Sequence, residues 1–81
     1  MEKQEVAPAK ADLSALKEFL PPFVARNWSD WKKYITVARG TIANADSLGT
    51  GPKKRVTIGN VVCYERDALI AWLEERSKKL S

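Results

Sequence analysis

Residues 28–60 read WSDWKKYI (28–35), TVARGTIANA (36–45) and, after a loop, KKRVTIGN (53–60). In the first piece, Trp31 and Ile35 are four residues apart, which predicts a short helix with one buried face. The β-branched pair Thr36 and Val37 weakens this helix and marks a turn. A second short helix is predicted from about Ala38 to Asp46, with Val37, Ile42 and Ala45 facing inward and Leu48 closing the unit. Helices this short are stable only when packed on the rest of a domain.

The third piece predicts a basic β-hairpin. Strands over residues 53–58 and 61–65 flank Gly59-Asn60, a two-residue loop with glycine first, as in a type II′ turn. This turn pairs Ile58 with Val61 and Val56 with Cys63, which puts four apolar side chains on one face. The other face then carries Arg55, Thr57, Val62 and Tyr64. Such a register fits a sheet that is packed on one side only.

Positive charge is concentrated in the same region. Residues 31–60 hold six Lys or Arg and a single acidic residue, Asp46, whereas residues 1–22 hold three Lys and four acidic residues. A concentrated basic segment on a small domain is typical of a polyanion binder, although a merely solvated basic surface is the alternative.

The flanking segments complete an α+β domain over residues 23–81. Residues 1–22 are expected to be a flexible tail with a short helix over 12–20, capped by Asp12 and ended by Pro21-Pro22. The apolar face of that helix (Leu13, Leu16, Phe19 and Leu20) could dock on the domain's own core or bind a partner protein. Residues 23–25 form an extended lead-in, residues 49–52 a flexible turn, and a final helix runs from Arg66 to about Lys79.

The amino-acid composition argues against several classes of function. The chain has 81 residues, one cysteine and no histidine, so it predicts one small domain without an internal disulfide or a zinc site. We expect no metal, no cofactor and no enzymatic activity, because no nucleotide motif or catalytic dyad is visible. No apolar run approaches a membrane span and no secretory signal is visible, so a soluble cytoplasmic protein is expected.

Seven residues are candidates for contact with DNA. On the second helix, Arg39, Thr41 and Asn44 are residue types that hydrogen-bond base edges or phosphates. The hairpin adds charge and a close backbone approach, and its candidates are Lys53, Lys54, Arg55 and Asn60. The alternatives are an ordinary solvated helix face and a charged edge strand that resists aggregation.

The aromatic residues and the cysteine point to a core instead. Trp31 and Trp72 lie on apolar helical stripes, so core packing is expected rather than stacking on single-stranded bases. Cys63 is expected to be a small buried apolar residue.

Two segments resemble MerR-like excisionases and AlpA-type regulators. The run from Gly49 to Gly59, followed by Tyr64 to Leu73, is similar to the wing and final helix of that family, "G-x-G-P … v-x-i-G … Y … d-l-x-x-W-L". Arg39-Gly40-Thr41-Ile42 is similar to the start of its recognition helix, with Ala38 in place of the usual serine. The resemblance covers roughly residues 23–76 and implies a winged helix-turn-helix.

In that family the protein bends DNA at attachment sites and assists an integrase, or it activates promoters. The resemblance therefore implies sequence-specific binding to double-stranded DNA by an excisionase-like factor of a phage or integrated element in the bacterial nucleoid. It implies an integrase or recombinase as partner, and monomers that bind cooperatively at repeated sites. A transcriptional regulator is the first alternative, and a protein-interaction adaptor that uses residues 12–20 is the second.

Overall fold

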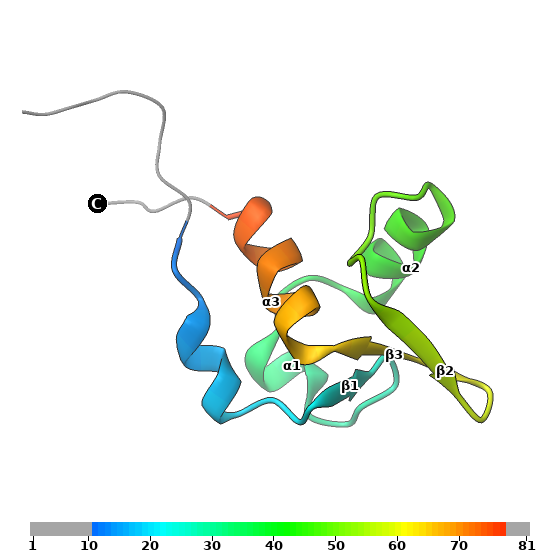
Figure 1. Cartoon of the computed structure of the whole chain (residues 1–81), viewed down its shortest axis with the longest axis horizontal. Helices are drawn as coiled ribbons and strands as arrows, with labels where there is room; N and C mark the ends of the chain where they lie inside the picture. The colour runs from blue at the N-terminus through cyan, green and yellow to red at the C-terminus, as the bar shows by residue number, and fades with distance from the viewer. Residues whose placement is uncertain (1–10, 78–81) are drawn as a thin grey trace, which may run out of the picture.

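A computed structural model of the chain describes residues 11–77. In chain order it contains a 3₁₀-helix η1 (Ser14–Glu18), strand β1 (Phe23–Ala25) and helices α1 (Trp31–Tyr34) and α2 (Arg39–Ser47). These are followed by strands β2 (Arg55–Ile58) and β3 (Val61–Glu65) and by helix α3 (Arg66–Glu75). η1 and α3 lie together at one end of the molecule, and α2 lies beside the start of the β2–β3 hairpin at the other (Figure 1). The small α+β class predicted from the sequence is confirmed.

The sheet has three antiparallel strands in the order β1-β3-β2, one more strand than the sequence predicted. The hairpin register is the predicted one, with Ile58 opposite Val61 and Val56 opposite Cys63. Gly59 has φ 64°, the positive angle that the first position of such a two-residue loop requires. The extended segment 23–25 is the added strand, and it places Val24 opposite Tyr64.

The packed face of the sheet is not the one with the four apolar side chains of the hairpin. Tyr64 is fully buried and Val62 is half-buried against the core, whereas Val56 and Ile58 are 45% and 56% exposed. The reason is that β1 adds Val24 to the Tyr64 face and the helices cover that same face. Tyr64 tolerates the burial because its hydroxyl finds polar partners there, as described below.

Every element except β2 and the short η1 helix contributes a buried residue to one core, and Leu20, just after η1, also joins it. The large side chains at its centre are Trp31, Ile42, Tyr64 and Leu69, each no more than 1% exposed. The expectation that Trp31 and Trp72 pack in the core is confirmed, since Trp72 is only 8% exposed. Cys63 is buried, as predicted.

The segment after residue 11 docks on the domain. Leu20 is buried, Leu13 and Leu16 pack on the core, and the Leu13 amide donates to Glu74 Oε2 at 2.7 Å. Of the two alternatives for this apolar face, the structure therefore shows docking on the domain's own core. Phe19 is the exception: it is 57% exposed and stacks on Tyr34, with ring centroids 5.5 Å apart. Residues 1–10 of the predicted tail lie outside the described residues.

The loop after α2 is built from specific contacts. The Thr50 amide donates to Ala45 O and the Gly49 amide to Asp46 O, which is the Schellman ending of a helix with glycine at positive φ, here 77°. Pro52 is buried, and Thr50 O accepts a hydrogen bond from Trp72 Nε1 at 2.8 Å. Leu48, which was expected to close the helix unit, is 69% exposed.

Helix α3 ends at Glu75, earlier than predicted. The Arg76 and Ser77 amides donate to Leu73 O and Glu74 O, and the Ser77 hydroxyl also donates to Glu74 O. These bonds tighten the last turn and close the helix. The predicted helical residues 78 and 79 lie outside the described part of the chain. Among residues 11–77, no helix is long and apolar enough to cross a membrane.

Candidate nucleic-acid interface

Helix α2 has one buried face and one free polar face. Ile42 and Ala45 are buried, whereas Arg39, Thr41 and Asn44 are on the side that faces solvent. Within residues 11–77 the side chains of Thr41 and Asn44 make no hydrogen bond, so their polar groups are available to a ligand. Arg39 Nη2 donates to Trp28 O at 2.6 Å, which holds this guanidinium near the start of α2.

The four candidate residues of the hairpin are also exposed, but they differ in their partners. Lys53 has no ion pair within the described residues, and Lys54 Nζ lies 3.9 Å from Glu65 Oε1. Arg55 Nη1 lies 3.5 Å from Asp46 Oδ1 on α2. Asn60 is at the tip of the hairpin, at the other end of β2 from Lys53. The structure thus brings the base of the hairpin to α2 and leaves Asn60 apart.

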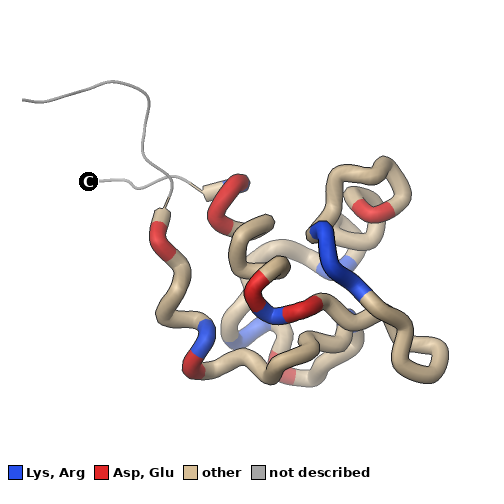
Figure 2. Tube along the Cα trace, viewed as in Figure 1, with Lys and Arg blue, Asp and Glu red and all other residues tan. Residues whose placement is uncertain are grey.

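The charges are unevenly distributed over the molecule. Figure 2 shows acidic residues on η1, on α3 and in the segments next to them, and the basic run that leads into β2 beside α2. Two acidic residues pair with that run: Asp46, in the last turn of α2, lies beside Arg55, and Glu65 lies beside Lys54. A polyanion approaching the base of the hairpin therefore meets three basic side chains, two of which have acidic neighbours.

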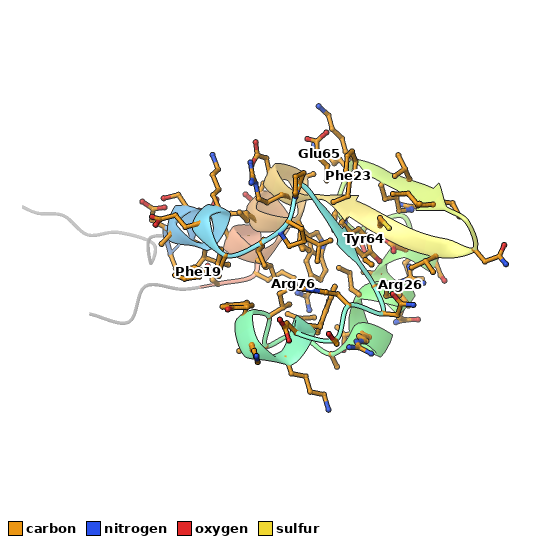
Figure 3. The ribbon with its side chains drawn as sticks, turned by 90° about the horizontal axis from the view of Figure 1, so that it is seen from below. Phe19, Phe23, Arg26, Tyr64, Glu65 and Arg76 are labelled. Carbon is orange, nitrogen blue, oxygen red and sulfur yellow. The ribbon has the colours of Figure 1, made fainter. Side chains whose placement is uncertain are left out.

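Asp46 is the centre of a polar network that no sequence pattern predicted. Its side chain is 8% exposed, and its Oδ2 accepts hydrogen bonds from Arg26 Nη2 and from the Tyr64 hydroxyl, both at 2.6 Å. Arg26 Nε also donates to the Tyr64 oxygen at 2.9 Å. Tyr64 and Arg26 lie on the helix side of the sheet, whereas Phe23 and Glu65 lie on the other side (Figure 3). The network therefore fixes α2 to the sheet.

The network changes the ionisation of two of its members. Burial raises the pKa of the Tyr64 phenol to about 12, and the hydrogen bond to Asp46 acts in the same direction. Burial alone would lower the pKa of Arg26, but its contacts with Tyr64 and Asp46 outweigh that effect and raise it. At neutral pH the Tyr64 phenol is therefore neutral and the Arg26 guanidinium is charged.

The Tyr64 shift predicts a loss of stability at alkaline pH. Because folding raises the pKa from 10.0 to about 12, the neutral phenol contributes stability that is complete below pH 10 and is lost as the pH rises through 12. The free energy of unfolding should fall by up to about 2–3 kcal/mol over that interval. Urea unfolding at several pH values measures it. Tyr64→Phe should be less stable at neutral pH and should lack this part of the alkaline decline; an equal decline in both proteins would contradict the assignment.

One sequence signal pointed to Asp46, namely that it is the only acidic residue between positions 31 and 60. An isolated carboxylate in a basic segment is favourably placed to pair with the cations around it. Its partners could not be read from the chain, because Tyr64 and Arg26 are 18 and 20 residues away in sequence.

Comparison of the chain with protein-family models, with curated proteins and with solved structures finds no match. Within residues 11–77 no group of three or more His, Cys, Asp or Glu side chains could hold a metal ion.

Proposed function

We propose that this domain is a winged helix-turn-helix that binds double-stranded DNA in a sequence-specific manner. In this proposal α1 and α2 form the helix-turn-helix, α2 enters the major groove, and the β2–β3 hairpin is the wing. The main observation in support is that Thr41 and Asn44 on α2 have no side-chain partner within the described residues, and that the same helix contacts the basic end of β2 through the Asp46–Arg55 ion pair. One rigid unit can then present base-reading and phosphate-binding groups together.

The biological role that we propose is that of an excisionase-like architectural factor of a phage or integrated element. Such a factor would bind as monomers side by side on DNA and assist an integrase. This proposed role is based on the resemblance of the segments 49–59 and 64–73 to MerR-like excisionases and AlpA-type regulators. The adaptor alternative loses its main support, because the apolar residues near η1 on which it depended pack on the domain itself.

Salt-dependent binding tests this proposal. Labelled duplexes selected from a random pool should be retarded by the protein, and affinity should fall steeply between about 50 and 200 mM salt if several phosphates are contacted. Asn44→Ala should reduce the preference for the selected site by about 1–3 kcal/mol, because it removes a base contact. Lys53→Ala is the matched control: it should weaken binding to all duplexes alike and lower the salt slope by about 1.

Two results would contradict the proposal. The first is no retardation of any duplex at low salt by a folded protein. The second is an Asn44→Ala variant whose preference among duplexes equals that of the natural protein, which would exclude α2 as the reading helix. Binding next to an integrase at attachment sites, compared with binding at a promoter, separates the excisionase role from transcriptional regulation.

A further inference from the structure

A single carboxylate on α2 contacts residues in two strands of the sheet and the residue that follows the third. Asp46 bonds to Arg26, the residue directly after β1, to Tyr64 in β3, and it faces Arg55 in β2. These contacts fix the distance between α2 and the base of the hairpin.

The two oxygens of this carboxylate are used differently. Oδ2 accepts two short hydrogen bonds, whereas the buried Oδ1 accepts none within the described residues. The guanidinium of Arg55 lies at an ion-pair distance from Oδ1, 3.5 Å. The Arg55 side chain is 44% exposed, so this guanidinium is open both to Asp46 and to a ligand from solvent.

Asp46 is held in place from the other side as well. A Cβ atom added at Gly51 would lie 1.9 Å from Oδ1, so the glycine backbone packs directly against the carboxylate. Arg26 and Tyr64 on Oδ2 and Gly51 beside Oδ1 together hold the carboxylate next to Arg55.

We infer that Asp46 limits the contact between Arg55 and the DNA backbone, and thereby restrains binding to duplexes of arbitrary sequence. A phosphate must compete with a fixed carboxylate for this guanidinium, so Arg55 releases less than one full counterion on binding. Lys53, two residues earlier and without an ion pair within the described residues, is under no such restraint. This inference rests on the proposed DNA binding.

The test is a double-mutant cycle read out as salt dependence. The natural protein, Asp46→Asn, Arg55→Gln and the double variant are each titrated with a non-specific duplex at several NaCl concentrations. When Asp46 is present, Arg55→Gln should reduce the slope of log K against log[salt] by clearly less than about 0.9. When Asp46 is replaced by Asn, the same substitution should reduce the slope by about 0.9. Asp46→Asn alone should bind the duplex more tightly, with a slope steeper by up to about 0.9.

Tyr64→Phe is the matched control for a merely structural role. It removes one hydrogen bond to Oδ2 but keeps the charge of Asp46, so its salt slope should equal that of the natural protein. If Asp46→Asn behaves like Tyr64→Phe, with no steeper slope, or if Arg55→Gln has the same effect in both backgrounds, the inference is overturned while DNA binding stands. If the natural protein binds no duplex, the proposed function fails and the inference fails with it.

A comparison without Asp46→Asn covers the case in which that variant does not fold. In the natural background, Arg55→Gln should lower the salt slope by less than Lys53→Gln does. Equal losses would show that Asp46 does not restrain Arg55, and would overturn the inference.

Discussion

Trp31→Ala should reduce the free energy of unfolding by about 3–5 kcal/mol, the usual cost of removing a large aromatic side chain from a core. Trp31 is 1% exposed, its ring packs against Tyr64, and its Nε1 donates to Val37 O at 2.8 Å. That hydrogen bond joins α1 to the turn before α2, so the substitution removes both core volume and the link between the two helices. A chain of this size has a total free energy of unfolding of about 4–12 kcal/mol. If the natural protein is near the lower end of that range, the Trp31→Ala variant should be largely unfolded.

Urea unfolding followed by far-UV circular dichroism measures this effect, with two variants as controls. Trp31→Phe keeps a ring in the core but loses the indole N–H, and should therefore cost less than Trp31→Ala. Trp28→Ala removes a half-buried ring that stacks on Tyr34 at 5.8 Å, and should cost about 1 kcal/mol. A Trp31→Ala variant no less stable than Trp28→Ala would show that Trp31 is not the central residue of the core.

Local chemistry predicted much of this fold. Gly59-Asn60 defined the hairpin register, because a two-residue loop leaves one pairing of the flanking strands. The spacing of Trp31 and Ile35 and the apolar stripe that contains Trp72 located residues that are buried in the structure, although Ile35 lies just after the end of α1.

The packed side of the sheet could not be predicted in the same way. Alternation along a strand separates two faces but does not say which one the helices cover. A three-residue strand, Phe23–Ala25, and the docking of the segment around Leu16 and Leu20 decide it, and both depend on contacts far apart in the chain. The hairpin register placed Tyr64 on the less apolar face, yet that face is the packed one and Tyr64 is buried there with Asp46 and Arg26 as partners.

The sequence predicted which residues form the candidate site but not which other residues they contact. Helical periodicity places Thr41 and Asn44 side by side, with Arg39 near the start of the helix, and all three are exposed in the structure. That Arg39 is tied to Trp28 O and Arg55 to Asp46 requires the tertiary arrangement. Contact of these residues with DNA stays a prediction.

Gly51→Ala is expected to destabilise the domain by about 2–4 kcal/mol, although it adds only one methyl group. The new Cβ would lie 1.9 Å from Asp46 Oδ1 and 3.2 Å from the Asp46 amide nitrogen. The carboxylate must move, and moving it breaks two 2.6 Å hydrogen bonds, to Arg26 and Tyr64, at a site where little water can replace them. Arg26 is 29% exposed, so the cost should fall below that of a fully buried pair.

Gly40→Ala is the matched control for this substitution, since a Cβ at Gly40, in the first turn of α2, meets nothing within 4 Å. Alanine favours a helix over glycine by roughly 0.5–1 kcal/mol, so Gly40→Ala should leave stability unchanged or raise it. In an Asp46→Ala background Gly51→Ala should cost much less than in the natural protein, because the carboxylate it displaces is gone. Urea unfolding of these variants measures the coupling. If the losses of stability from Gly51→Ala and Asp46→Ala simply add, the glycine is needed for the backbone of its loop and not for the position of Asp46. Only a clash between the new methyl group and the Asp46 side chain makes the two substitutions depend on each other.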